Sequence, residues 1–591
     1  MSEEKNKKKK WLIIILSSVL ALLIATGGVV WYFLEYYGDD APKKAKKKGL
    51  IILTEEEIDN PDEIIDDIDI EPDDFNIDFI DEDDFEDFDT PQILTLKNKT
   101  SVNNKFMGFG AIYYPWIYWN DDAGRNYTEE QRQIELNRLT DSGVTWIRTM
   151  IYARSEWYNK NTGVWSYSGE HYDGLLKFFK EMDKRGIDVL LNFEWGGAIQ
   201  PDSSGNMTIF NDSTLSKMGT MDDRIVMYGN FCTSFTQKLK EDGINCIKYI
   251  TFFSEPANRR QLGGQYGTEE FDTVFLAKIV PAYTKIIKTV HDDFTAAGIR
   301  KDYKFVGNNQ SSYYYINLYT WQQMKPLYDP VKDYIDEFDY HFYNRVANPK
   351  GATYDDFVII PETHATDIEK YMGIKSNDTW IDEFNITHNG AEGNFSALTQ
   401  QYGAIFSLKD DPYTATQIGN TLLAFLNCGY KTASIWTFIN TLWPNSTQTG
   451  GEFNGGVMLD GLMPNLMESQ VPYNAYYAFS MITRYCNNAK SVYACDMGEA
   501  DGLAASCVYD KDGSVTVFVV NSNLFDVEFK MNFENKLSKC VLYRHLYDPE
   551  TFESDTSAKP IGVDRALINV TGGFADKIPS GAVAVYTTSK K

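Results

Sequence analysis

Histidine and cysteine are both scarce in this chain of 591 residues, which contains six histidines and seven cysteines. The histidines are scattered and no two cysteines have CxxC spacing, so the sequence gives little support to a zinc site or a metal-dependent enzyme. We therefore expect no metal and no cofactor. The odd number of cysteines argues against a disulfide framework, and a bond between Cys486 and Cys495 is an alternative to buried thiols.

Basic residues with interleaved aromatics are also missing outside the N-terminal lysines, so we expect no nucleic-acid partner. Acidic residues are concentrated instead: Glu55 to Asp89 contains 20 of them and no basic residue. Such a run repels itself and stays extended, which predicts a disordered acidic linker over residues 35–95. Docking of its Ile and Phe side chains to a partner or to Lys43–Lys48 is the alternative. Without these 20 charges the net charge of −28 becomes −8, so the folded part is only mildly acidic.

One long hydrophobic run is present at residues 11–34, which are uncharged and mostly apolar. A helix needs about 20 such residues to cross a bilayer, whereas the apolar part of a secretory signal has about 7–15. We interpret the run as a transmembrane signal-anchor that follows a cytoplasmic basic tail at residues 1–10. The large C-terminal region of a single-pass cell-membrane protein would then be extracellular. A long cleaved signal peptide, which gives a secreted protein, is the alternative.

From Phe106 to about Tyr485, short apolar runs alternate with amphipathic stretches, as in repeated βα units. Eight runs have the character of strands, so residues 96–485 are predicted to form a (β/α)8 TIM barrel of the α/β class. Residues 129–143 and 172–186 have helical spacing and end at glycine, and a helix over 471–486 would close the ring. The predicted strands are 105–114, 144–152, 187–195, 247–255, 304–310, 338–344, 379–384 and 433–440.

Beyond the predicted barrel, the pattern changes to alternating strands joined by tight turns. Residues 506–521 contain two β-runs joined by Asp510-Lys511-Asp512-Gly513, which is a strong hairpin signal. We expect residues 486–591 to form a small all-β sandwich that stabilises the barrel, with carbohydrate binding as the alternative role.

Two predicted strands end in a glutamate, Glu255 on the fourth and Glu383 on the seventh. The C-terminal ends of the strands are where TIM barrels place their chemistry, and glycoside hydrolysis requires a pair of carboxylates. In a retaining mechanism one carboxylate attacks the anomeric carbon, while the other first donates and then accepts a proton. The pair therefore predicts a glycosidase.

Short motifs around these glutamates extend the pattern: SEP at Glu255, IDEF at Glu383, DYHFYN with His341 and Tyr343, and WIRTM with Arg148. Residues 105–485 resemble the clan A retaining glycoside hydrolases, which carry glutamates on strands four and seven. The resemblance implies that Glu255 is the acid/base and Glu383 the nucleophile. It also implies that the Tyr343 hydroxyl steadies the nucleophile and that Arg148 keeps it ionised. As structural alternatives, Arg148 is an ordinary ion-pair partner and His341 a core residue.

Trp436 in SIWTF matches the tryptophan that forms the floor of the clan's subsite −1, with core packing as its alternative. One position departs from the clan pattern, because Ser254 stands where an asparagine usually binds the sugar 2-hydroxyl. Asn258 could replace that contact. The layout of barrel and sandwich is most similar to families thirty and thirty-nine.

Aromatic side chains are abundant in the predicted loops after the strands, where they could stack against sugar rings or plug the top of the barrel. Several such platforms favour an oligosaccharide or polysaccharide. The further candidates for sugar contacts are the aromatic Trp116, Trp195 and Trp443 and the polar Asn192, Glu194 and Asn309.

The sequence therefore predicts a monomeric, metal-independent retaining β-glycoside hydrolase acting on an extracellular β-linked oligo- or polysaccharide. One alternative is an inactive surface carbohydrate-binding protein, with Ser254 as a sign of lost activity. Another is a transglycosylase that remodels the cell envelope with the same residues.

Overall fold

The computed structural model divides the chain into two units, residues 1–70 and 71–591. The first unit, with the predicted basic tail and transmembrane helix, lies outside the described residues. Within the described ranges, no helix has the length and apolar character needed to cross a membrane. The structure describes residues 78–80, 91–118, 127–194, 208–256, 271–307, 309–312, 321–346, 354–388, 411–444, 455–458, 461–464 and 470–589.

A parallel sheet with the order β10-β11-β12-β13-β3-β4-β7-β8-β9 forms the centre of the first domain. β13, the last barrel strand along the chain, pairs with β3, the first, so the sheet is joined between these two strands. Two short strands, β9 and β10, together occupy the position of the fifth barrel strand. Val306, which directly follows β9, forms a β-bridge with Glu337, and β10 pairs with β11. The result is a TIM-like barrel with strands at the positions that the sequence predicts: β3 (Phe109–Ile112), β4 (Trp146–Ile151), β7 (Asp188–Phe193), β8 (Ile247–Phe252), β9 (Lys304–Phe305), β10 (Gln310–Ser312), β11 (Phe338–Val346), β12 (Thr379–His388) and β13 (Thr432–Ile435).

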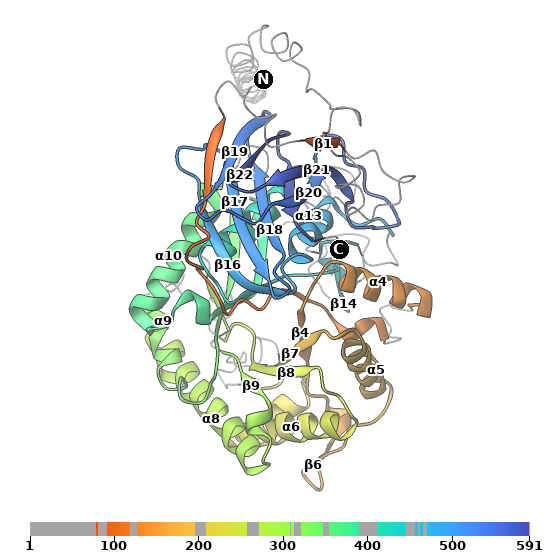
Figure 1. The fold of residues 1–591 in the computed structure, drawn as a ribbon. Coiled ribbons are helices and arrows are strands. Elements are labelled where there is room, and N and C mark those ends of the chain that lie inside the picture. Colours follow the sequence, from red (N-terminus) through yellow and green to blue (C-terminus); the bar gives the residue numbers. More distant parts are fainter. Residues whose placement is uncertain are drawn as a thin grey trace, which may run out of the picture. The chain divides into compact units, whose positions relative to one another are not determined.

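Helices follow the strands and lie outside the sheet, as α5, α6, α8, α9 and α10 show in Figure 1. Local sequence sets their ends: Thr128 and Gln131 form a capping box at the start of α4, and Gly186 takes a φ of 68° at the end of α5. The helices are α4 (Glu129–Asp141), α5 (Glu170–Arg185), α6 (Met221–Glu241), α8 (Val280–Ala296), α9 (Trp321–Tyr328), α10 (Asp355–Met372), α12 (Pro412–Asn427) and α13 (Asn474–Thr483).

Shorter elements lie in the connections. The 3-10 turns are η2 (Pro115–Tyr118), η3 (Ser155–Trp157), η5 (Leu215–Lys217), η7 (Arg300–Asp302) and η9 (Ser376–Asp378), and the π-helix η6 (Phe271–Ile279) precedes α8. Two small antiparallel pairs are β5 (Tyr158–Asn159) with β6 (Val164–Trp165), and β14 (Thr441–Pro444) with β15 (Gly455–Met458).

The C-terminal region is a β-rich domain with the strand order β1-β21-β20-β23-β18-β17-β16-β2-β19-β22. The predicted hairpin is present, because β17 and β18 pair in antiparallel register around Asp510 to Gly513. The strands are β1 (Asp78–Ile80), β2 (Gln92–Leu96), β16 (Ala489–Asp496), β17 (Leu503–Asp510), β18 (Val515–Asn521), β19 (Val527–Phe533), β20 (Cys540–Tyr547), β21 (Val563–Val570), β22 (Gly573–Ile578) and β23 (Val583–Thr587).

Alternating side chains give β18 two buried faces. Val517 and Val519 pack in the core of the β-rich domain, whereas Phe518 and Val520 join the core of the barrel. The two domains therefore share a continuous apolar contact, to which α12 contributes.

The predicted linker overlaps this domain. Residues 92–95 were expected to be disordered, but they belong to β2, which pairs with β16 and β19. The backbone of Asp78–Ile80 also forms a strand, paired with β21. The rest of the predicted linker up to residue 90 lies outside the described residues. All seven cysteines are free, so the possible bond between Cys486 and Cys495 does not form.

Candidate active site

A β-bulge in β12 determines which side chains meet at the mouth of the barrel. Tyr340 of β11 pairs with Ile381 and His341 pairs with Glu383, so Asp382 is an extra residue in β12. A bulge re-aims side chains that would otherwise alternate between the two faces of the sheet. As a result, Asp382 and Glu383 both reach Nη1 of Arg148, with oxygens at 3.3 and 2.9 Å.

Glu255 and Glu383 face each other on either side of His341. Nδ1 of His341 lies 2.9 Å from Oε1 of Glu255 and 3.3 Å from Oε2 of Glu383. One polar atom from each of the three groups lies within 4.8 Å of the other two. Retaining glycosidases hold their carboxyl groups about 5–5.5 Å apart and inverting ones about 6.5–9.5 Å apart. The 4.8 Å limit joins one oxygen of each carboxyl group, so Glu255 and Glu383 are close enough for the retaining arrangement.

Glu383 is held at both carboxylate oxygens. Arg148 donates to Oε2 at 2.9 Å, and the Tyr343 hydroxyl donates to Oε1. Burial raises the pKa of Glu383, while the charges of His341 and Arg148 and the hydrogen bond from Tyr343 oppose that rise without cancelling it. These contacts fix the orientation of Glu383, whose role as nucleophile stays a prediction.

His341 is fully buried and surrounded by carboxylates. Burial lowers the pKa of His341. The charges of Glu383 and Asp382 and hydrogen bonds to Asp382 and Glu255 have the larger, opposite effect and raise this pKa to about 10. The ring is therefore an imidazolium near neutral pH. Nη1 of Arg148 lies 3.1 Å from Nε2 of this ring, and Asp382 contacts both groups, so one carboxylate offsets the repulsion between the two cations.

Two buried aspartates beneath the site were missed by sequence reasoning. Asp339 and Asp382 are fully enclosed. Burial and the charge of Asp382 hold the pKa of Asp339 well above its usual range, whereas the pKa of Asp382 is lowered because Arg148 and His341 overcome the effect of burial. Asp382 is the charged member and Asp339 the neutral one. Asp339 stands two residues before His341 on the same strand, so the two side chains lie on the same face. This spacing in the sequence could have identified Asp339 as part of the site.

Asn192 and Asn309 form a cage around Arg148. Oδ1 of Asn192 accepts hydrogen bonds from Nε and Nη2 at 3.1 and 2.7 Å, and Oδ1 of Asn309 accepts from Nη2 at 3.2 Å. Glu194 accepts from the backbone N–H groups of Ala153 and Asn211 and from the Asn211 amide. Asn192, Glu194 and Asn309 are each 0% exposed and take part in these hydrogen bonds, and their contact with sugar hydroxyls stays a prediction.

The backbone is strained at the same edge of the barrel. Glu194, Phe253, Glu255 and Asn309 have φ values of 64°, 60°, 55° and 56°. Non-glycine residues with such values are uncommon, and each costs about 1–3 kcal/mol. Only Ala558 and Asn569 share this property elsewhere in the described ranges. Concentration of this strain at the ends of the third, fourth and fifth strands is typical of a functional site.

Of the remaining predicted site residues, the structure describes the side chains of two and not those of the other four. Trp436 is 6% exposed and packs with Ile112, Tyr114 and Met150, so it lies in a small cluster beside the site. Ser254 is buried next to Glu255. Asn258 and Trp195 lie outside the described residues, and the side chains of Trp116 and Trp443 are likewise not described, so these four stay predictions.

Glu255, His341 and Glu383 are also spaced such that they could ligate a metal ion. The local charge favours a hydrogen-bonded cluster instead, because the guanidinium of Arg148 already lies 2.9 Å from Glu383.

Solved structures with a similar fold cover most of the chain. The catalytic domain of GH30 xylanase C from Talaromyces cellulolyticus has a TM-score of 0.51 and 13% identity, and covers 84% of this chain and 100% of its own. A GH51 α-L-arabinofuranosidase from Thermotoga petrophila RKU-1 has a TM-score of 0.53 and 13% identity, and covers 84% of this chain and 99% of its own. The chain therefore shares the fold of these GH30 and GH51 glycoside hydrolases.

These similarities confirm the predicted resemblance in fold, including the likeness to family thirty, and they add family 51, which the sequence did not predict. No protein-family model matches the chain, and no curated protein matches it by sequence. At such low identity the comparison establishes the fold, and the chemistry has to be argued from the site itself.

Proposed function

We propose that the protein is a retaining glycoside hydrolase that cleaves a β-linked oligo- or polysaccharide by double displacement. The observation that carries this proposal is the facing pair of Glu255 and Glu383, with polar atoms within 4.8 Å of each other and of His341. Glu255 follows β8, the fourth barrel strand, and Glu383 lies on β12, the seventh, next to Phe384, which pairs with the last residue of β13. This is the C-terminal side of the barrel, where TIM barrels place their chemistry.

In the first step, Glu255 protonates the leaving oxygen while Glu383 attacks the anomeric carbon and forms a glycosyl-enzyme ester. The His341 imidazolium donates from Nδ1 to Oε1 of Glu255, which leaves Oε2 as the position for the transferred proton. As Glu255 becomes a carboxylate, the same imidazolium stabilises the new charge. In the second step Glu255 removes a proton from water, which attacks the ester and releases Glu383.

Arg148 and Tyr343 hold the nucleophile during both steps. They fix both oxygens of Glu383, so the carboxylate keeps one orientation while its charge is consumed and restored. Asn192 and Asn309 in turn fix the guanidinium of Arg148.

The variants Glu383→Gln and Glu255→Gln test the two roles separately. Glu383→Gln should lower kcat by about 10⁴-fold or more on every substrate, because no covalent intermediate can form. Glu255→Gln should spare the first step for glycosides with good leaving groups, which need no acid, and therefore show a burst of released aglycone. Glu369→Gln, an exposed change on α10, is the matched control.

The substrates for this test are 2,4-dinitrophenyl and alkyl glycosides of β-xylose, β-glucose and α-L-arabinofuranose. The set follows from similar structures that include a GH30 endoxylanase, an endo-β1,6-glucanase and family 51 α-L-arabinofuranosidases. Equal losses in both variants with both leaving groups would contradict the assigned roles. An inverted anomeric configuration of the first product, seen by NMR, would contradict the retaining mechanism.

The same experiments separate the alternatives. An activated 2-fluoro glycoside should form an ester on Glu383, whereas an inactive carbohydrate-binding protein would remain unlabelled. A transglycosylase would form the ester but transfer the sugar to an added acceptor rather than to water, which product analysis at high acceptor concentration detects.

The proposal also includes a location outside the cell, anchored by residues 11–34. The uncharged, mostly apolar run at 11–34 supports it, together with a polysaccharide substrate, which cells meet outside the membrane. Membrane fractionation with N-terminal sequencing of the mature chain tests this. An intact N-terminus in the membrane fraction supports the anchor, and a soluble chain cleaved after residue 34 overturns it.

A further inference from the structure

One outer strand of the C-terminal domain comes from the acidic run, far in sequence from the strands beside it. β1 (Asp78–Ile80) lies in the segment that the sequence predicts to be a disordered linker, yet its backbone pairs in parallel with β21. Both strands belong to the same compact unit, residues 71–591, and Figure 1 shows β1 beside β21. The acidic run therefore contains a short segment with a defined place on the folded domain.

Without β1, the strand β21 would be at the edge of its sheet. The described strands follow the order β1-β21-β20-β23, so β20 covers one side of β21 and β1 covers the other. An uncovered strand edge presents a row of backbone N–H and C=O groups that need a further strand or water as partners. Such an edge accepts an extended segment by strand addition.

The burial of β21 agrees with an occupied outer side. Ala566 and Leu567 are both 0% exposed, although they are consecutive and their side chains therefore point to opposite faces of the sheet. Arg565, just before them, is only partly buried. The fully buried positions are among those that pair with β1, since the register joins Asp78 to Arg565, Phe79 to Ala566 and Ile80 to Leu567. At these positions β21 has the burial of an interior strand.

Positive charge on β21 does not explain why an acidic segment pairs there. Arg565 donates to Asp576 at 2.6 Å, and Arg544 on the neighbouring strand β20 donates to Asp576 at 2.7 Å and to Asp564 at 3.1 Å. Two arginines are thus balanced by two aspartates within the domain. What β21 offers is its backbone, so the occupant that it fits is an extended segment with high strand propensity.

The sequence of β1 meets this requirement, and the residues after it oppose further strand addition. Phe79 and Ile80 are of types that are enriched in strands, whereas Asp and Glu are depleted. Once β1 is in place it becomes the new edge, and the four residues that follow it, Asp81 to Asp84, are all acidic. Charged residues at an edge are one way in which proteins prevent edge-to-edge association, because the same charges on another copy repel them.

We propose that the outer side of β21 is a strand-binding site whose occupant is Asp78–Ile80 of the same chain, and that this occupant prevents β21 from pairing with another copy of the protein. The linker is thereby attached to the C-terminal domain at β1 as well as at β2. Neither strand carries a residue of the candidate active site, so this role is tested separately from the proposed hydrolase.

Hydrogen–deuterium exchange of the 591-residue chain, measured by mass spectrometry on peptides covering residues 563–570, tests the pairing. The double variant Phe79→Pro with Ile80→Pro lacks two backbone N–H groups and cannot pair as a strand, so the outer amides of β21 should exchange at least about tenfold faster. Phe85→Pro with Phe88→Pro is the matched control, because it also replaces two aromatic or apolar residues of the acidic run but lies outside β1. The control should exchange as the wild type does.

Two internal checks make the exchange result specific. Amides of β18, an interior strand of the same sheet, should exchange equally in all three proteins. Exchange of residues 563–570 in the wild type should not change with protein concentration, because the occupant belongs to the same chain.

Sedimentation of the same three proteins in a common detergent, at increasing concentration, tests the protective role. The Phe79→Pro with Ile80→Pro variant should self-associate at concentrations at which the wild type and the control remain monomers, because its β21 edge is open.

Each part of the proposal has an outcome that overturns it. Equal exchange at residues 563–570 in all three proteins, or an equal increase at β18, would overturn the strand-binding site. Protection that rises with protein concentration would mean that the occupant comes from another copy. Faster exchange at β21 without self-association would overturn the protective role of β1.

Discussion

Asp382 illustrates how a single residue sets the charge of the site. It is fully buried, and its oxygens lie 3.3 Å from Nη1 of Arg148 and 3.5 Å from Nε2 of His341. Its negative charge is one cause of the raised pKa of His341. Asp339, packed nearby, stays protonated because burial and the charge of Asp382 hold its pKa well above the usual range. The buried pair therefore carries one charge rather than two.

The isosteric change Asp382→Asn should shift the pH dependence of the enzyme. Without this charge, the pKa of His341 falls from about 10, so the imidazolium loses its proton at a lower pH. Glu255 then loses a charged hydrogen-bond partner, and the alkaline limb of the kcat/KM profile should move to lower pH by one or more units. Activity at the optimum should fall by about 10- to 100-fold.

Asp339→Asn is the matched comparison because it replaces a neutral acid with a neutral amide of the same shape. The Asn309 backbone N–H donates to Oδ1 of Asp339, and an asparagine retains that acceptor. The alkaline limb of this variant should stay within a few tenths of a unit of the wild type. If Asp339→Asn shifts the profile as far as Asp382→Asn does, the assignment of the single charge to Asp382 is wrong.

At the scale of elements, the bulge in β12 separates what the sequence could predict from what it could not. The strands and the two glutamates follow from apolar runs, and the partners Arg148, His341 and Tyr343 follow from motifs that resemble those of clan A glycoside hydrolases. Strict alternation, however, places Asp382 on the face opposite Glu383. Only the pairing of His341 with Glu383 and of Tyr340 with Ile381 reveals the extra residue. Register between strands depends on tertiary packing, so no local pattern encodes it.

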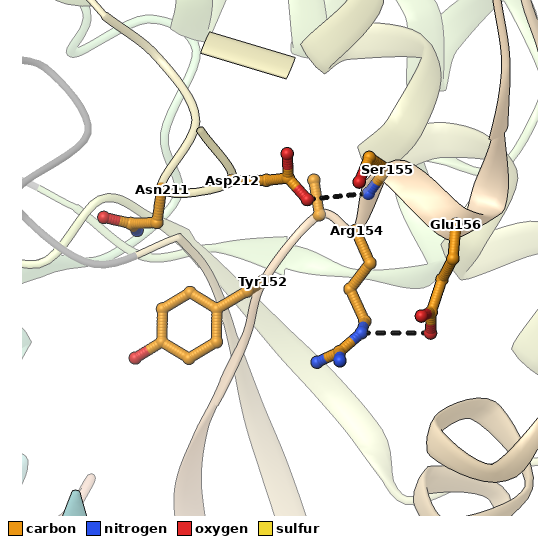
Figure 2. A pocket seen from close by; sticks show the side chains of 7 residues that line it. Tyr152, Arg154, Ser155, Glu156, Asn211 and Asp212 are labelled. Carbon is orange, nitrogen blue, oxygen red and sulfur yellow. Dashed lines mark hydrogen bonds and ion pairs between the residues drawn. The ribbon is translucent and has the colours of Figure 1, made fainter. Parts of the chain in front are cut away.

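Burial was the second feature that local patterns could not supply. Asn192, Glu194 and Asn309 stand at strand ends, where the sequence predicts contact with substrate, yet each is fully enclosed. Glu194 and Asn309 also have positive φ values of 64° and 56°, a conformation that no apolar run in the sequence indicates. A pocket of about 400 Å³ lined by Tyr152, Asn211 and Asp212 (Figure 2) was missed for a related reason, since its two walls are distant in sequence and are joined by hydrogen bonds of Glu194 and Asp212.

At the scale of the whole molecule, the N-terminal side of the barrel and the C-terminal domain are one folded system. β2 lies between β16 and β19, with Leu94 and Leu96 fully buried in the core of the β-rich domain, and Figure 1 shows this orange strand beside the blue ones. The β-rich domain in turn packs on the barrel through α12, where a Cβ at Gly419 would lie 3.1 Å from Val520 and from Val583. Composition alone assigned β2 to an acidic linker because the strand directly follows the acidic run.

The start point of a soluble fragment should therefore decide its stability. A fragment of residues 91–591 keeps β2, whereas one of residues 97–591 loses it. The loss removes two buried leucines, worth about 1.5–3 kcal/mol each, and exposes the edges of β16 and β19. The shorter fragment should unfold several degrees lower in a thermal scan and aggregate more readily. A fragment of residues 81–591 is the control, because it keeps β2 and should unfold at the same temperature as 91–591. Equal transitions for 91–591 and 97–591 would mean that β2 adds nothing to the fold, and that the domain boundary lies at residue 96 as the sequence alone predicts.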